Sequence, residues 1–322
     1  MSSFLNTKQL KSIMSSSPSR QAPPILVTGA AGSVGGVGRT LTKLLLDNGH
    51  RVRAMVRRQD ERAEALASLG AEVLVGDLLD LKSVHAAIEG CARVYFSMSV
   101  SASYLEASVN AAAVARHHGV EAFVNMSQMT VSQMSITETT PSPQQRLHWL
   151  AEQALNWSGL PVVHVRPTVF MEGFFQQMCA PLLQRSNVIS LPMGDGKTSP
   201  IAGADVARAL AAILDDPAPH IGRIYNLAGP QSESWSFYAG EFSEALGRPI
   251  TYQDIAPEAW RERLVAWGLP SHLIDHLMTI AALNRQNRFD RASDDMAALT
   301  GTPAMSLREF VRRHAAAYAA SA

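Results

Sequence analysis

Cysteine is scarce in this sequence. Its 322 residues include two cysteines, Cys91 and Cys179, which lie far apart and form no C-x-x-C pair. That pattern argues against a disulfide framework and against a structural zinc site. It favours a reducing compartment, so we expect a cytoplasmic protein. No cluster of His, Asp and Glu has convincing metal-ligand spacing, so we expect no bound metal.

Net charge and long apolar runs are also missing. The 28 Lys and Arg residues balance 28 Asp and Glu residues, which gives no electrostatic support for a nucleic-acid partner. No apolar run approaches the length of a membrane span, so we expect no membrane association. The first 20 residues lack acids and carry Lys8, Lys11 and Arg20. They resemble a weak organelle-targeting presequence or, the reading we favour, a disordered extension over 1–22.

The stretch PILVTGAAGSVGGVGR, residues 24–39, organises what is present. A short apolar run leads into glycines at G-x-x-G-x-x-G spacing, and a helical pattern follows, which is typical of a dinucleotide-binding turn. Residues 36–38 lengthen the loop, so either Gly35 or Gly38 lets the helix pack closely against the sheet. A plain structural turn is the alternative. We expect the cofactor phosphates to contact Gly29, Ala31, Gly32, Ser33, Val34 and Gly35.

Short apolar runs alternate with helical patterns through the first half of the chain. The predicted strands are 24–28, 50–58, 71–75, 92–98, 121–126 and 161–165. This alternation predicts an α/β fold with a doubly wound parallel sheet, the Rossmann fold. After residue 168 the rhythm changes. We therefore predict a dinucleotide-binding domain over 23–168 and a smaller, mainly helical substrate lobe over 169–322, from which about 201–228 return to the sheet.

The end of the second predicted strand indicates which dinucleotide binds. An NAD site usually has an acid there, whereas this chain has Arg57 and Arg58, with Asp60 only later. Guanidinium groups suit a 2′-phosphate, so we expect NADP(H) in preference to NAD(H); a solvated arginine pair is the alternative. The remaining cofactor contacts that we predict follow the other strands: Asp77, Leu78, Ser97, Met98, Met126 and Pro167. Asp77 is nearly as consistent with a turn cap.

Several motifs together resemble a known family. ILVTGAAGSVG, VRAMVRR, VLVGDL, FVNMSQ, AEQAL, SGLPVVHVRPTVF, DVARAL and TGTPAMSLREFV resemble the NmrA-like branch of the atypical short-chain dehydrogenases/reductases. The resemblance covers nearly all of 24–320. It implies the Rossmann fold and an NAD(P) cofactor. The family includes NAD(P)H-dependent quinone and dye reductases as well as dinucleotide-sensing regulators, so the resemblance does not choose a reaction.

One departure from the wider superfamily bears on the chemistry. Its reductases carry Tyr-x-x-x-Lys on the helix after the fifth strand, and the resemblance places Gln144 and His148 at those two positions. Carbonyl reduction through a tyrosine acid is therefore not expected. Ser127 matches the family's serine, and imidazole titrates near pH 7, so we predict Ser127 and His148 as the groups that orient or protonate the acceptor. The alternative is that Ser127 only caps the end of a strand and that His148 is a buried histidine hydrogen-bonded by the backbone. His164 is interpreted as a hydrogen-bonded core residue, and His272 and His276 as surface or packing residues.

A Met- and Phe-rich set lies near the predicted pocket mouth. Thioethers and aromatic rings form adaptable apolar cavities that suit a flat aromatic substrate, and ordinary core packing is the alternative. We predict substrate contacts from Tyr95, Met129, Phe170 and Phe174.

Two functions remain open from the sequence. The first is an enzyme, a monomer or homodimer, that transfers hydride from NADPH to an apolar conjugated acceptor such as a quinone, an enone or a dye. The second is an NADP(H)-binding redox sensor with no turnover, which the missing Tyr and Lys favour.

Overall fold

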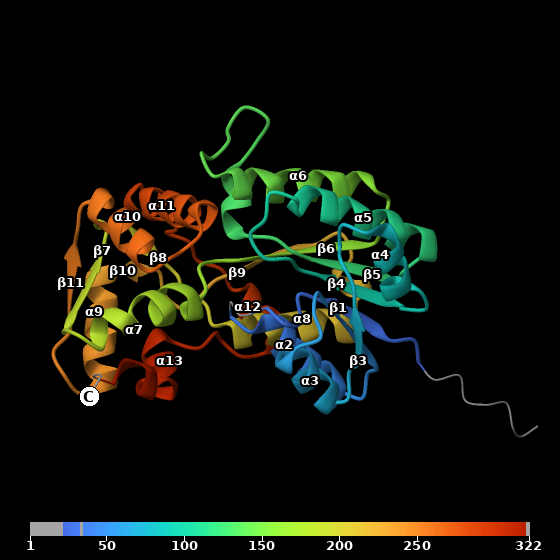
Figure 1. Ribbon diagram of the computed structural model, residues 1–322, viewed down its shortest axis with the longest axis horizontal. Coiled ribbons are helices and arrows are strands. Elements are labelled where there is room, and N and C mark those ends of the chain that lie inside the picture. The colour runs from blue at the N-terminus through green and yellow to red at the C-terminus, as the bar shows by residue number, and fades with distance from the viewer. Residues whose placement is uncertain (1–21, 33–34, 320–322) are drawn as a thin grey trace, which may run out of the picture.

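A seven-stranded parallel sheet forms the centre of the molecule (Figure 1). The computed structural model describes residues 22–32 and 35–319. The strand order is β3-β2-β1-β4-β5-β6-β9, and all neighbours are parallel. The strands are β1 (Ile25–Thr28), β2 (Val52–Val56), β3 (Glu72–Val75), β4 (Arg93–Phe96), β5 (Ala122–Met126), β6 (Val162–Pro167) and β9 (Ile224–Leu227). The order reverses between β1 and β4, which confirms the doubly wound Rossmann fold.

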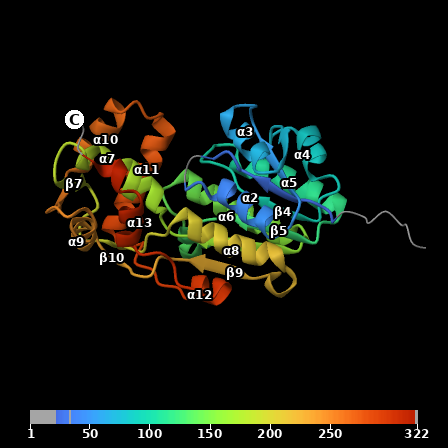
Figure 2. The same ribbon diagram turned by 90° about the horizontal axis from the view of Figure 1, so that it is seen from below.

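Helices cover both faces of this sheet (Figures 1 and 2). One face carries α2 (Val37–Asp47), α3 (Glu61–Ser68), α8 (Gly203–Asp215) and α12 (Asp295–Thr300). The other carries α4 (Leu81–Ile88), α5 (Tyr104–His118) and α6 (Pro143–Trp157). Each face encloses its own apolar core, which explains why the strands are continuous apolar runs rather than alternating ones.

A second, smaller lobe lies beyond the carboxyl ends of the central strands (Figure 1). Its helices are α7 (Ala180–Leu183), α9 (Trp235–Leu246), α10 (Pro257–Ala266), α11 (Ser271–Arg285) and α13 (Leu307–Arg313). The π-helix Glu172–Met178 and the short turn Ala315–Tyr318 also belong to this lobe, whereas the short turns Met129–Gln133 and Ala218–His220 follow β5 and α8 of the sheet unit. This lobe has a separate core that includes Phe175 stacked on Trp235, with ring centroids 4.5 Å apart.

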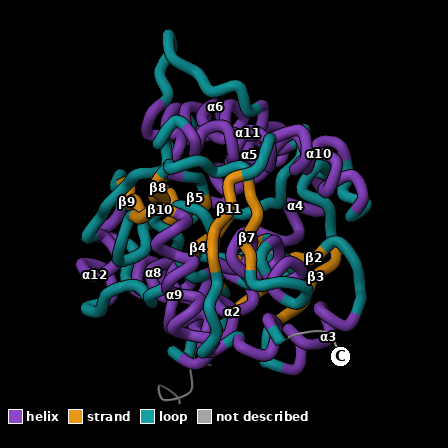
Figure 3. The backbone as a smooth tube through the Cα atoms, turned by 90° about the vertical axis from the view of Figure 1, so that its left-hand side faces the viewer, coloured by secondary structure: helices purple, strands orange, loops and turns teal. Residues whose placement is uncertain are grey.

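The small lobe differs from the sequence-based expectation in detail. It contains two strand pairs that the sequence did not indicate: β7 (Val188–Leu191) with β11 (Thr251–Asp254), and β8 (Lys197–Thr198) with β10 (Glu233–Ser234). Figure 3 shows β7 and β11 on the outer side of this lobe. These strands have two to four residues each, too short for a periodicity to emerge. Ser306 caps α13 by accepting a hydrogen bond from Glu309 N.

A buried ion pair fixes α6 against β6. Arg166 Nε donates to Glu152 Oε1 over 2.9 Å, and the Glu152 carboxylate is 1% exposed. A buried carboxylate needs such a partner, because removing charge from water is costly. The pair therefore sets the position of α6, and with it the first two turns of α6 at the carboxyl edge of the sheet.

Candidate functional site

The carboxyl ends of β1 and β4 are joined directly. Thr28 Oγ1 donates to Ser97 O over 2.9 Å and accepts from Ser97 N over 2.8 Å. Gly29 follows with φ +66°, and a Cβ there would lie 2.9 Å from Ser97 O. Only glycine accommodates both the left-handed backbone and this close approach. The chain therefore turns sharply at the point where the strand order reverses.

Two glycines of the lengthened loop, Gly38 and Gly35, pack closely against different parts of the chain. A Cβ on Gly38 would lie 2.7 Å from both Gly29 O and Ala30 Cα, so Gly38 occupies the position where α2 packs closely against the turn. Gly35 has φ +67° and packs against the start of α8, because a Cβ on Gly203 would lie 2.0 Å from Gly35 O. Ser33 and Val34, both predicted cofactor contacts, lie outside the described residues.

The start of α2 has the features of an anion site. Its first turn contains no acidic residue, and its N-cap Gly36 makes no side-chain cap hydrogen bond. The unpaired N–H groups and the helix dipole both favour negative charge at such an end. Together with the exposed Gly32, these features fit the diphosphate of a nicotinamide dinucleotide.

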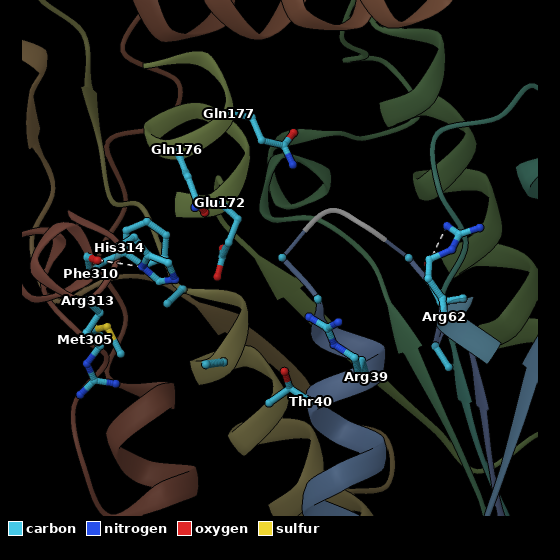
Figure 4. Close-up of a pocket in the computed structure, with 17 residues that line it drawn as sticks. Arg39, Thr40, Arg62, Glu172, Gln176, Gln177, Met305, Phe310, Arg313 and His314 are labelled. Atoms are coloured by element: carbon cyan, nitrogen blue, oxygen red, sulfur yellow. Dashed lines mark hydrogen bonds between the residues drawn. The ribbon is translucent and has the colours of Figure 1, made fainter. Parts of the chain in front are cut away.

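A cavity of about 620 Å³ opens between this loop and the small lobe (Figure 4). Arg39 and Arg62 line its Rossmann side, and Glu172, Arg313 and His314 line it from the small lobe. Arg62 also donates to Ala31 O over 3.1 Å. The sequence analysis missed all five. Arg39 could have been predicted from the sequence, because it directly follows Gly38 in the first turn of the helix. Arg313 and His314 come close to the loop only through the tertiary fold.

The end of β2 bears exposed charge, as the sequence suggested. Arg57 Nη2 lies 3.2 Å from Asp77 Oδ2, and Arg58 is exposed. Asp77 also accepts a hydrogen bond from Leu79 N over 3.0 Å, so it does act as a turn cap. Leu78 is half-buried, and its carbonyl accepts from Asn110. Both arginines are exposed at this end of the site, Arg57 within its ion pair with Asp77.

The end of β4 requires one correction. Tyr95 is 1% exposed and packs in the core between the sheet and α2. Burial raises the pKa of its hydroxyl well above the usual range. Tyr95 is therefore neither an acid nor an exposed substrate contact. Ser97 and Met98, which follow it, are half-buried at the sheet edge.

The α6 helix places polar groups beside this edge. Gln144 Oε1 accepts from Ser101 N over 3.1 Å. One turn later, the His148 ring lies 4.0 Å from the Tyr104 ring, centroid to centroid. Tyr104 Oη in turn donates to Met126 O over 3.0 Å, and Met126 precedes Ser127. Tyr104 thus connects His148 to the end of β5, where Ser127 lies.

The ionisation of His148 differs from the expectation. Burial, together with the nearby His276, lowers the pKa of its imidazole to about 3. His148 is therefore neutral at pH 7 and is not a charged acid there, which corrects the predicted general-acid role. By contrast, His164 is a hydrogen-bonded core residue, as interpreted: its ring nitrogens lie 3.1 Å from Asn125 Nδ2 and 2.9 Å from Asn156 Oδ1.

Much of the apolar set serves as core. Phe174 is 5% exposed and belongs to the small-lobe core, so it is mainly a packing residue rather than an open substrate contact. Phe170 is half-buried against the glycine loop, with its Cδ1 3.2 Å from where a Gly35 Cβ would be. Met129 is buried behind the end of β5, and Pro167 ends β6. None of these four is charged, so this side of the site is apolar.

Residues 22–32 and 35–319 contain no group of three or more His, Cys, Asp or Glu side chains that could hold a metal ion. No helix in the same ranges is both long and apolar enough to cross a membrane.

The fold and the glycine turn define a nicotinamide-dinucleotide-binding protein. The family model described as NAD(P)H-binding matches residues 32–217, and the chain belongs to that family. The regulator NmrA, solved with NADP, shares the fold with a TM-score of 0.74 at 19% identity over 91% of this chain and 95% of its own. These findings confirm the NmrA-like resemblance.

Several relatives match the chain almost end to end. NAD(P)H azoreductase of Xenophilus azovorans is 28% identical over 92% of this chain and 100% of its own length. Triphenylmethane reductase of Citrobacter sp., solved with NADP(H), has a TM-score of 0.79 at 24% identity over 90% of this chain and 99% of its own. The Escherichia coli NADPH-dependent quinone oxidoreductase QOR2, solved with NADPH, has a TM-score of 0.78 at 26% identity over 90% and 99%.

The close packing at Gly38 generates a first prediction. Gly38→Ala should weaken NADPH binding at least tenfold, because the new methyl group forces α2 away from the turn that receives the phosphates. Isothermal titration calorimetry measures the affinity. Gly240→Ala is the matched control, since a Cβ at this helical position meets nothing within 4 Å. Equal affinities for Gly38→Ala and the parent would contradict the assignment.

The half-buried imidazoles of His148 and His276 generate a second prediction. Burial lowers the pKa of His148 to about 3 and that of His276 to about 4, from an ordinary value of 6.5. Below pH 6.5 these two imidazoles are protonated in the unfolded chain but stay neutral in the folded chain. The free energy of unfolding therefore decreases as pH falls from 6.5 towards 4. The urea midpoint should therefore fall less between pH 7 and pH 4.5 in His148→Gln than in the parent. The exposed His272→Gln should match the parent; a parallel loss in all three proteins would rule out His148 as a source.

Proposed function

We propose that this protein is an NAD(P)H-dependent reductase that acts on apolar, conjugated, electron-poor acceptors such as quinones and dyes. The observation that carries the proposal is the azoreductase relative, which this chain matches over that protein's whole length. When bound, a reduced nicotinamide supplies a hydride, which is two electrons and one proton, to the acceptor.

The residues of this chain have three tasks in the proposal. The glycine turn and the start of α2 hold the diphosphate, with Arg39 and Arg62 nearby. The ends of β4, β5 and β6 position the nicotinamide, so that a hydride donor and an acceptor carbon meet at roughly 3–3.5 Å. The apolar residues after β5 and β6 exclude water. A strong acid is not required, because such acceptors already stabilise the added electron pair.

The preference for NADP(H) over NAD(H) is part of the same proposal. Arg57 and Arg58 lie at the end of β2, and that strand end lacks the acid that would favour a 2′-hydroxyl. We also assign the protein to the cytoplasm, on the basis of its two buried free cysteines, and expect a monomer or homodimer.

The proposal is tested by the absorbance of the reduced nicotinamide. Purified protein should bleach NADPH in the presence of a quinone or a cationic dye, and more slowly bleach NADH. Tight NADPH binding without bleaching across both acceptor classes would overturn the reductase and leave a dinucleotide sensor. No binding of either dinucleotide would overturn both.

The arginine assignment gives a sharper prediction. Arg58→Ala, and separately Arg57→Ala, should lower kcat/KM for NADPH about 10- to 100-fold, the effect of losing a charge-assisted hydrogen bond worth roughly 1.5–3 kcal/mol. The same variants should change kcat/KM for NADH less than twofold. Arg51→Ala, an exposed arginine just before β2, is the control. Equal losses with both dinucleotides would show that the arginines do not read the 2′-phosphate.

A further inference from the structure

Unpartnered polar atoms gather at the start of α6. Four side chains in this region have buried atoms with no hydrogen-bond partner in the described residues: Ser127 Oγ, Gln144 Nε2, both amide atoms of Gln145, and His148 Nδ1. Buried polar groups in native proteins are nearly always hydrogen-bonded. Such a concentration in one place therefore indicates that water or a ligand completes it.

The Gln144 amide has a defined orientation. Its Oε1 accepts from Ser101 N, which is a donor and cannot exchange roles, so the Nε2 end is the unpartnered one. Gln144 is 5% exposed. The amide oxygen is thus held by the loop after β4, and the amide nitrogen finds no acceptor among the residues that the structure describes.

The surrounding groups share one face. Gln144 and His148 are four residues apart on α6 and so lie on the same side of the helix. Tyr104 connects this side to the end of β5, through its 4.0 Å ring contact with His148 and its hydrogen bond to Met126 O. The set therefore lies where β4 and β5 end, which is where ligands of open α/β sheets bind.

The small lobe contributes to the same place. The α11 helix lies beside α6 in both Figure 1 and Figure 3. His276 of α11 also has a buried, unpartnered Nδ1, and it influences the pKa of His148. The small lobe therefore contributes a further imidazole near this polar set, whose members carry amide, hydroxyl and imidazole groups and no carboxylate or ammonium group.

We propose that Gln144 donates a hydrogen bond to the heteroatom of a carbonyl-type acceptor. His148 and Ser127 lie beside it and position the acceptor. This inference rests on the proposed reductase function. A bound NADPH would supply the hydride and become NADP⁺, the acceptor carbon would take the hydride, and the π pair would move onto the heteroatom. Gln144 Nε2–H would donate to the charge that develops there. An amide does not give up its proton, so the proton that completes the product comes from water.

This assignment has a consequence for specificity. A carbonyl acceptor such as a quinone develops negative charge on oxygen during hydride addition and gains from a neutral donor. A cationic triarylmethane-type dye loses its charge at the reacting carbon and develops no oxyanion. Gln144 should therefore matter for the first class and much less for the second.

The test compares the two acceptors in one variant. Gln144→Leu keeps the side-chain volume but removes both donors, and it should lower kcat/KM for a benzoquinone at least tenfold more than for the cationic dye. The NADPH dissociation constant should stay within threefold of the parent. Gln153→Leu, on the same helix outside the polar set, should retain both activities.

The outcomes separate the two proposals. A parent protein that reduces neither acceptor overturns the reductase function itself. If the parent reduces both acceptors and Gln144→Leu lowers both rates equally, or neither, the donor role of Gln144 is wrong. Gln144→Asn, which restores an amide on a shorter chain, should recover part of the quinone rate; a Gln144→Asn rate as low as that of Gln144→Leu would also contradict the donor role.

Discussion

The hydrogen-bonded joint between Thr28 and Ser97 is the constraint on which the site depends. It fixes the ends of β1 and β4 at the distance where Gly29 just fits. Because the strand order reverses at this joint, the connections leave the sheet in opposite directions and a crevice opens between them. The start of α2 faces this crevice on one side, and the start of α6 faces it on the other. The joint thus positions the phosphate region, and the Arg166–Glu152 ion pair holds the acceptor region at the same edge of the sheet.

The two ends of the crevice differ in electrostatic character. The phosphate end has arginines, exposed glycine backbone and an uncapped helix start, all of which favour negative charge. The acceptor end has amide, hydroxyl and neutral imidazole groups in a buried setting, where burial holds the pKa of His148 to about 3. Such a division suits a reaction in which a charged cofactor is anchored firmly at one end. At the other end a hydride passes between weakly polar partners.

The fold could be predicted from the sequence because its signals are local. Each central strand is a short apolar run closed by a turn, and the glycine spacing of 29–38 marks the switch point. The candidate site was only partly predictable. Arg313 and His314 lie nearly 280 residues from the glycine loop in the chain and reach it only through the packing of α13. Likewise, the sequence could not show that Tyr95 points into the core or that burial removes the proton from His148, because both depend on neighbours supplied by other elements.

The most direct test of direct hydride transfer is the fate of deuterium from the nicotinamide. The protein would be supplied with NADPH deuterated at both C4 positions and with a cationic triarylmethane-type dye, whose reduced carbon does not exchange with water. Mass spectrometry of the leuco product should show one deuterium on that carbon, and unlabelled NADPH in D₂O should place none there. Dye reduction with the label absent, or with deuterium drawn from the solvent, would contradict a direct hydride transfer within this site.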